Sequence, residues 1–213
     1  MSISDRKERE KERRRRDILD TAEILFFQKG FENVTMADIA NEIELARSTL
    51  YLYFKNKEEI YLAIAIRGSK ILRKMFMECY ERGATGLEKV RMLTLAFSRF
   101  CMEYPGYYDA NWFSHSVRFD EEFPEIEEIK EIRTQNFKLV GEAFKEGIKD
   151  GTIRPDADPV KTTLVLTSSM QNVLNLTPAV ELHMKNNNLT HEELIDYAVD
   201  MMMRSFESKQ EKK

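Results

Sequence analysis

The chain has 213 residues, of which 42% are hydrophobic and 33% charged, and its formal net charge is -4. This length holds one or two modest domains with enough apolar side chains for a core. The negative total excludes a protein that coats nucleic acid over its whole surface, but it leaves room for a local basic patch. With 8 glycines and 5 prolines there are few tight turns, so long helices are expected.

The charge run at residues 6–16 contains eight Lys or Arg and three Glu, which gives a local charge of +5. Such a run cannot bury surface, so it is a solvated tail or a frayed helix start, and residues 1–15 are expected to form a flexible tail. Whether the tail is only solvated or is a basic arm that touches a polyanion stays open. A signal peptide would need an apolar stretch here, and no apolar run reaches the ~18 residues of a membrane span. We therefore expect a cytoplasmic protein that does not enter a membrane.

The first sixty residues predict three short helices. Apolar periodicity covers residues 17–30, Thr35 and Asp38 resemble a capping box for a second helix, and residues 46–54 form a third of two turns at most. A tight turn separates the last two, which is the helix-turn-helix layout.

The third helix has two distinct faces at about 100° per residue. Ala46, Leu50 and Phe54 share one arc, which can dock on the first two helices. The opposite face carries Arg47, Ser48, Tyr51 and Leu52, with Thr49 at its flank. A helix this short is not stable alone, so a scaffold must hold that face outward, as entry into a DNA major groove about 12 Å wide requires.

The rest of the chain predicts longer helices, over residues 57–82, 86–103, 124–149, 159–175 and 191–207, with a short helix or aromatic-rich turn at 105–119. No strand pattern competes with them. The expected fold class is therefore all-α with about nine helices.

The sequence contains no motif for metal binding or catalysis. Cys79 and Cys101 lie among apolar residues, and the three histidines are scattered, so neither set has zinc-ligand spacing. No phosphate-binding glycine loop, nucleophile elbow or His-Glu metal motif is present. We expect two buried thiols, no metal, no cofactor and no enzymatic activity.

Three segments carry a resemblance to a known family: Gly30-Phe31, Thr35-Met36-Ala37-Asp38-Ile39-Ala40, and Ser48-Thr49-Leu50-Tyr51-Leu52-Tyr53-Phe54-Lys55-Asn56-Lys57-Glu58. Residues 16–63 thereby resemble the DNA-binding domain of TetR-type (TetR/AcrR) transcriptional regulators. The resemblance implies a helix-turn-helix DNA-binding domain at 16–62 and a helical effector-binding and dimerisation domain at 63–213.

The same resemblance implies site residues. Phosphate contacts would come from Thr35, Thr49, Tyr53 and Lys57, and base-edge or groove contacts from Arg47, Ser48 and Tyr51. Leu52 stands where a second tyrosine is common and could contact a thymine methyl. Two further departures are Glu44 in place of a glycine often found in the turn and Ala46 in place of the usual Ser cap. Loss of that cap should cost the helix roughly 0.5–2 kcal/mol.

A dimer and a ligand pocket are expected in the second domain. Helix-turn-helix proteins commonly bind two half-sites as dimers, and the final two helices supply candidate interface side chains: Leu164, Val165, Met170, Val173, Ile195, Val199, Met202 and Phe206. These could instead pack only within the monomer. A dense set of Met, aromatic and polar residues could line a pocket or fill a core: Met75, Phe97, Phe100, Cys101, Tyr108, Trp112, His115, Phe137 and Gln171. The resemblance favours the dimer and the pocket.

The predicted function is that of a transcriptional repressor. It would bind a palindromic operator in double-stranded DNA as a homodimer and be released by a small, hydrophobic effector. Displacement of the helix over residues 57–82 would change the separation of the two recognition helices. The alternative is a helical interaction protein that binds polyanions or membrane surfaces through its basic tail without sequence specificity.

Overall fold

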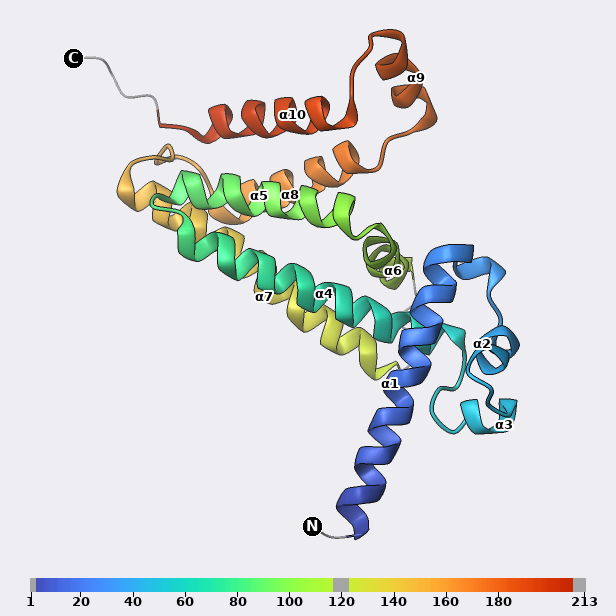
Figure 1. Cartoon of the computed structure of the whole chain (residues 1–213). Coiled ribbons are helices and arrows are strands. Elements are labelled where there is room, and N and C mark those ends of the chain that lie inside the picture. The colour runs from blue at the N-terminus through green and yellow to red at the C-terminus, as the bar shows by residue number, and fades with distance from the viewer. Residues whose placement is uncertain (1–2, 117–122, 209–213) are drawn as a thin grey trace, which may run out of the picture. The chain divides into compact units, whose positions relative to one another are not determined.

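The computed structural model describes residues 3–116 and 123–208, and in this part of the chain the fold is all-α (Figure 1). The elements are α1 (Ile3–Lys29), the 3-10 turn η1 (Phe31–Asn33), α2 (Met36–Glu42), α3 (Arg47–Leu50), α4 (Lys57–Arg82), α5 (Gly86–Glu103), α6 (Pro105–Ser116), α7 (Pro124–Asp150), α8 (Pro159–Leu174), α9 (Pro178–Asn186) and α10 (His191–Phe206). These are ten α-helices among the described residues, against about nine expected.

The chain divides into two compact units. Unit 1 comprises Met1–Ser69 and Tyr104–Lys130, and unit 2 comprises Lys70–Glu103 and Glu131–Lys213. The boundaries fall inside α4 and α7, so each of these helices contributes residues to both units.

Helix α1 begins at Ile3, so the charged run expected to be a flexible tail is instead its first part (Figure 1). Glu, Lys and Arg are strong helix formers, and Glu10–Arg14 and Glu12–Arg16 have the i,i+4 spacing that favours a helix. Of the two expected forms, a solvated tail and a frayed helix start, the structure has the helix. A solvated helix needs no burial of its charged side chains.

The core of unit 1 joins the first three helices to the start of α4. Ile18, Ile39, Leu50, Phe54 and Ile60 are each at most 1% exposed and belong to one cluster. The start of α7 packs on the same cluster and contributes two isoleucines, Ile126 and Ile129. The short α2 and α3 therefore owe their stability to tertiary packing.

An aromatic cluster in unit 1 connects η1, α4 and α6. The Phe31 ring stacks on Tyr61 with 4.6 Å between centroids and lies 4.6 Å from the Phe113 ring. Phe26 meets the edge of Tyr61 at 5.1 Å. Burial, with a smaller effect from Asp109, raises the pKa of Tyr61 to about 12. Its hydroxyl is therefore neutral at physiological pH.

Unit 2 is built around α5, which contacts α8 and α10. Leu93 and Phe100 of α5 and Phe144 of α7 are each 1% exposed or less. The start of α5 approaches the end of α7 so closely that a Cβ on Gly86 would lie 1.9 Å from Gly147 N, which explains the glycine. Gly86 N donates to Asp150 Oδ2 at 2.7 Å and so fastens the two ends together.

Helix α9 escaped the sequence analysis although its start carries familiar signals. Thr177 Oγ1 accepts a hydrogen bond from Val180 N at 3.4 Å, and Pro178 occupies the first turn. Its apolar face is weak, because Met184 is the one buried residue along it. Without an apolar stripe, periodicity gives no signal.

The cysteines are free thiols. Cys101 is buried, and burial raises its pKa to about 12, whereas Cys79 is half-buried. Over residues 3–116 and 123–208, no cluster of His, Cys, Asp and Glu could hold a metal ion. In the same ranges no helix is both long and apolar enough to cross a membrane.

Candidate nucleic-acid interface

Helix α2 is held at its start by a complete capping box. Asp38 N donates to Thr35 Oγ1 at 3.2 Å, and Thr35 N donates to Asp38 Oδ2 at 2.8 Å. The Thr35 hydroxyl also donates to Asp38 Oδ2 at 2.6 Å, and these bonds lower the pKa of the Asp38 carboxyl below its usual value. For Thr35 to donate its hydroxyl to a phosphate, the hydrogen bond from that hydroxyl to Asp38 Oδ2 would have to break.

The turn between α2 and α3 depends on Glu44, which has a left-handed φ of 54°. Leu45 N donates to Ala40 O at 2.9 Å and closes the end of α2. A residue with a Cβ pays roughly 1–2 kcal/mol for the left-handed region. This geometry explains why a glycine is common at this position in TetR-type sequences.

Replacing Glu44 with glycine is expected to raise the free energy of unfolding by about 0.5–1 kcal/mol, because the strain at φ 54° disappears. The gain is smaller than the full strain because glycine has more freedom in the unfolded chain. Urea denaturation measures it. The control Glu42→Gly, at the end of α2, should lower stability. A Glu44→Gly protein no more stable than the parent would contradict the strain.

Helix α3 is anchored on one side and open on the other. Leu50 is fully buried and Phe54 is 1% exposed, and Phe54 N donates to Leu50 O at 3.2 Å. No side chain caps the start of the helix at Ala46, as the sequence predicts. The buried pair fixes the orientation of the helix on the core of unit 1.

The outer face of α3 and its following turn is exposed as the helical phase requires. Arg47 and Ser48 are exposed, Tyr51 is 53% exposed and Leu52 is 78% exposed. The two flanking residues expected to contact phosphate, Thr49 and Tyr53, are half-buried at its edge. Two large apolar or aromatic groups held in water beside an arginine form a surface suited to a partner.

Lys57 has internal partners. Its Nζ donates to Phe31 O at 3.0 Å and lies 4.2 Å from the centroid of the Phe31 ring. The sequence resemblance implies a phosphate contact here, but in the structure Lys57 fastens the start of α4 to η1. A contact to phosphate would use the remaining donors of the same ammonium group.

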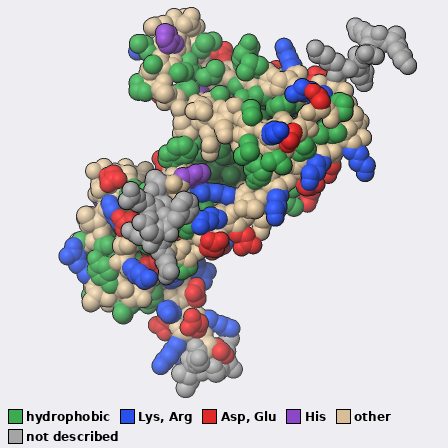
Figure 2. Space-filling view, turned by 180° about the vertical axis from the view of Figure 1, so that it is seen from behind, with side chains coloured by type: hydrophobic (Ala, Val, Ile, Leu, Met, Phe, Trp, Pro, Cys, Tyr) green, Lys and Arg blue, Asp and Glu red, His purple; other side chains and the backbone are tan. Residues whose placement is uncertain are grey.

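The charge around α3 favours an anionic partner. Arg47 and Lys55 are exposed, and no acidic residue lies between 45 and 57. The first part of α1, by contrast, displays basic and acidic side chains interspersed (Figure 2). At α3 no acidic side chain offsets the basic ones within residues 45–57, whereas three glutamates do so within the charge run at 6–16.

Arg15 has a role in the structure that its place in the charge run does not predict. Its guanidinium carbon lies 4.4 Å from the centroid of the Phe54 ring, and Nη2 lies 3.4 Å from Glu125 Oε1. Arg15 precedes Ile18 by three residues, so both lie on the inward face of α1. That spacing could have separated Arg15 from its exposed neighbours.

The expected pocket residues divide between the units. Unit 1 contains Tyr108, Trp112 and His115, with Trp112 49% exposed and its ring stacked on His115 at 5.6 Å. Unit 2 contains the other six: Met75, Phe97, Phe100, Cys101, Phe137 and Gln171. Phe100 and Cys101 are buried, whereas the other four in unit 2 are half-buried.

The expected dimer residues need revision. Met170, Ile195, Val199 and Phe206 are between 0% and 7% exposed and belong to the core of unit 2, so they have no area to offer a partner. Val173 and Met202 are half-buried against the same core, and only Leu164 and Val165 are exposed. The apolar periodicity identified the inward face because a stripe that packs within the monomer has the same spacing as one that packs on a partner.

Leu164 and Val165 belong to a larger set of exposed apolar side chains along α8 to α10. Each is between 40% and 70% exposed: Val160, Leu164, Val165, Val180, Leu182, Leu189, Tyr197 and Met201. Hydrophobic side chains are visible at the surface of the α9 segment, at the upper left of Figure 2. We call this set the outer apolar face.

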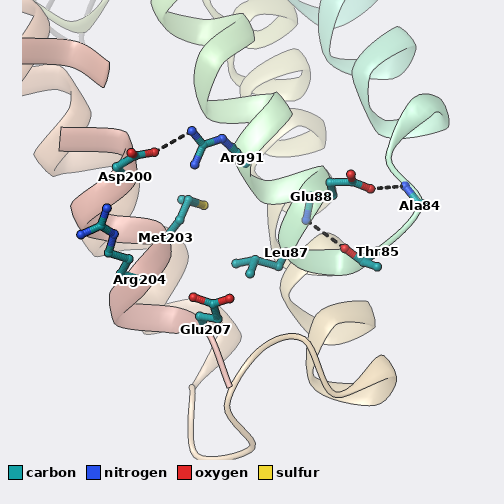
Figure 3. Close-up of a pocket in the computed structure, with 9 residues that line it drawn as sticks. All are labelled: Ala84, Thr85, Leu87, Glu88, Arg91, Asp200, Met203, Arg204 and Glu207. Atoms are coloured by element: carbon teal, nitrogen blue, oxygen red, sulfur yellow. Dashed lines mark hydrogen bonds and ion pairs between the residues drawn. The ribbon is translucent and has the colours of Figure 1, made fainter. Parts of the chain in front are cut away.

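One cavity, of about 630 Å³, lies between the start of α5 and the end of α10. Figure 3 shows Arg91 paired with Asp200 across it, at 2.6 Å, with Leu87 and Met203 between them and Glu207. None of the expected pocket residues lines it. Its charged walls differ from the apolar site that the sequence predicts.

Comparison with known proteins identifies the N-terminal fold. The family of bacterial regulatory proteins, tetR family, matches residues 18–64. YfiR of Bacillus subtilis, an uncharacterized HTH-type transcriptional regulator, is 39% identical over 66 residues, which are 30% of this chain and 32% of that protein. The HTH-type transcriptional repressor KstR2 of Mycolicibacterium smegmatis is 24% identical over 145 residues, 68% of this chain and 70% of that protein.

Solved structures share the whole fold. A TetR/AcrR-family regulator from Thermobifida fusca has a TM-score of 0.72 at 20% identity and covers 89% of this chain and 96% of its own. AibR, solved with isovaleryl coenzyme A and operator DNA, has a TM-score of 0.67 at 22% identity and covers 88% of this chain and 97% of its own. The shared fold and the matching helix-turn-helix domain agree with the exposed α3 face, and residues 18–64 are a DNA-binding domain of the TetR family, a family of transcriptional regulators and not of enzymes.

Proposed function

We propose that this regulator is a repressor that binds a palindromic operator as a homodimer and leaves it when a small hydrophobic effector binds. Residues 16–62 would form the DNA-binding domain, and residues 63–213 the effector-binding and dimerisation domain. The observation that carries the proposal is the outer face of α3, exposed at Arg47, Tyr51 and Leu52 and anchored by fully covered apolar side chains. KstR2 is a repressor by name, and IcaR of Staphylococcus epidermidis is a negative transcriptional regulator by name, which supports repression as the mode of regulation.

Arg47, Ser48 and Tyr51 are the candidates for contact with base edges, and Thr49 and Tyr53 for contact with phosphate. Arginine pairs bidentately with guanine, and hydroxyl groups at the edge of a groove reach the backbone. The test is selection of duplexes from a random pool by the full chain. We expect inverted half-sites about one helical turn apart and affinity that falls steeply with salt. A pool that remains random would reject the proposal.

The outer apolar face supports a homodimer. Eight large apolar side chains are exposed between residues 160 and 201 of unit 2, and a concentration of exposed apolar side chains is typical of a protein–protein contact. A second copy of the chain can cover them by twofold symmetry and place two α3 helices for two half-sites. Sedimentation velocity at micromolar concentration should give the mass of two chains. A monomer at that concentration would remove this part of the proposal.

The effector site is proposed among half-buried side chains of unit 2. Four partly buried apolar side chains pack against the core of unit 2: Leu72, Met75, Phe97 and Leu139. Polar groups accompany them: Arg73 Nη1 donates to Asn136 Oδ1 at 3.4 Å, and burial lowers the pKa of Arg133 to about 10. Apolar walls with a few cationic or amide groups suit an amphipathic molecule with a polar head.

A thermal-shift screen should reveal this effector class. AibR was solved with isovaleryl coenzyme A, so the panel begins with short acyl coenzyme A esters and free fatty acids. A ligand at 100 times its dissociation constant adds about 2.7 kcal/mol to folding, a shift of several degrees in Tm. The same compound should release the selected operator. Stabilisation that leaves DNA binding unchanged would separate ligand binding from regulation and contradict the effector role.

A further inference from the structure

Arg15 lies between Phe54, which ends the turn after α3, and Glu125, at the start of α7. All three residues belong to unit 1. Its guanidinium carbon is 4.4 Å from the centroid of the Phe54 ring. On its other side, Nη2 is 3.4 Å from Glu125 Oε1, in the first turn of α7. Phe54 is 1% exposed and the Glu125 side chain 10% exposed, so one arginine bridges two covered groups.

The ion pair is poorly built for stability. Glu125 Oε2 is buried and accepts no hydrogen bond from the part of the chain that the structure describes. A separation of 3.4 Å is longer than the roughly 2.7–2.9 Å of a strong charge-assisted hydrogen bond. Burial, more than any neighbouring charge, raises the pKa of Glu125, and Glu59 and Glu128 raise it further while Arg15 lowers it. Because burial disfavours the ionised carboxylate, an uncharged glutamine of similar shape avoids that cost at position 125.

The same residues occupy a suitable place for transmitting a change of position. Helix α7 is continuous from Pro124 to Asp150, and its later part supplies Leu139 to the proposed effector site. Phe54 closes the turn that follows α3, where Phe54 N bonds to Leu50 O. The chain of contacts therefore runs from α7 through Glu125 and Arg15 to the segment that carries Tyr51 and Leu52.

A second polar connection in unit 1 does not reach α3. Arg67 of α4 pairs with Asp20 at 2.7 Å and with Glu23 at 2.9 Å, and Tyr107 of α6 donates to Glu23 at 2.7 Å. This network joins α4 and α6 to α1 only. It has several short hydrogen bonds, as expected for a contact that stabilises the fold.

We propose that Arg15 and Glu125 form a coupling contact through which the position of α7 sets the orientation of the recognition helix, so that Arg15 is a positioning residue for DNA binding. The inference rests on the proposed function, because it assumes that α3 reads DNA. With Glu125 ionised, Arg15 is held against Phe54 and α3 is oriented for the operator. Protonation of Glu125, or displacement of α7, releases Arg15.

The direction of the pH effect follows from the groups around Glu125. These are Arg15 of α1, Glu59 of α4 and Glu128 of α7 itself. Because the pKa of Glu125 is raised in the folded chain, the contact is complete above that pKa and is lost as pH falls through it. The ratio of operator affinity between the parent and a Glu125→Gln variant should thus be largest at a pH above the pKa of Glu125 and approach one below it.

The test compares Glu125→Gln with Glu127→Gln, which makes the same charge change at an exposed site of the same turn. The probe is a duplex selected by the parent protein, and affinity is measured by fluorescence anisotropy between about pH 5 and pH 8. We expect Glu125→Gln to bind about 5- to 30-fold more weakly at the upper end, with its Tm not lowered. Glu127→Gln should match the parent. Hydrogen exchange of residues 47–54 should quicken in Glu125→Gln alone.

A double-mutant cycle with Arg15→Gln separates coupling from direct DNA contact. We expect Glu125→Gln to have no further effect on affinity in the Arg15→Gln background. The salt dependence of binding should be unchanged by Arg15→Gln, whereas a lost phosphate contact would reduce the slope by about one per site. Arg14→Gln, at an exposed neighbour, is the matched control. Equal affinities for Glu125→Gln and the parent at every pH, additive effects in the cycle, or a reduced salt slope would each overturn the coupling. Failure of the parent to select any duplex would instead reject the proposed function.

Discussion

Replacing Arg47 with alanine is expected to weaken operator binding by about 1–3 kcal/mol for each half-site, or about thirtyfold and more for a dimer. Arg47 begins α3, is exposed, and has no acidic residue within the following ten positions. If its guanidinium contacts a base, the variant will also accept other bases at one position of each half-site. Anisotropy titration on the selected duplex and on single-base variants measures both effects.

Two comparisons sharpen this prediction. Lys138→Ala removes an exposed cation from α7 in unit 2 and should leave affinity unchanged. Arg13→Glu with Arg14→Glu reverses two exposed charges of α1 and tests the basic-arm alternative. Binding that survives Arg47→Ala, is insensitive to sequence and disappears with the α1 double variant would favour non-specific polyanion binding over operator recognition.

Introducing glutamate at both Leu164 and Tyr197 is expected to convert the dimer into a monomer and to reduce operator affinity by more than a hundredfold. The two side chains are 52% and 70% exposed, on α8 and α10, which contact each other. Two carboxylates per chain in an apolar interface cost several kcal/mol without partners. A monomer also loses the gain from engaging two half-sites at once. Sedimentation velocity gives the mass, and circular dichroism checks that the helices remain.

The control for the dimer prediction is Met77→Glu, which places the same charge at an apolar side chain of α4 that is 36% exposed. It lies outside the outer apolar face and should leave the mass of two chains unchanged. A Leu164→Glu, Tyr197→Glu protein that still sediments as a dimer would show that the second copy binds elsewhere. A parent protein that sediments as a monomer would also contradict a dimer formed through the outer apolar face.

Helix bounds were predictable to a large extent. The helices at Lys57–Arg82 and Gly86–Glu103 have the predicted limits, because Asn56, Pro105 and an all-round apolar pattern mark them locally. The start of α1 was expected to be a flexible tail, with a frayed helix start as the alternative, and α9 was not predicted at all. In both segments few side chains are buried, so the sequence lacks the apolar periodicity that indicates a packed helix face.

The candidate site was predictable in its outward residues and less so in its internal contacts. Helical phase alone places Arg47 and Tyr51 opposite Leu50. Phase does not show that Lys57 bonds to Phe31 O or that Arg15 reaches Glu125, since those partners are 26 and 110 residues apart. Long-range pairs depend on how helices cross, which local spacing does not encode.

The sequence by itself determined an all-α chain, its helix-turn-helix start and the two faces of α3, because these follow from local capping and from a period of 3.6 residues. Only the tertiary structure decided which apolar stripe of α8 and α10 is core and which is surface, since both have the same period. It also decided that Glu44 is left-handed and that Arg15 bridges Phe54 and Glu125. Burial depends on how the helices pack, so only the packed molecule distinguishes a residue that stabilises the core from one that is free to contact a partner.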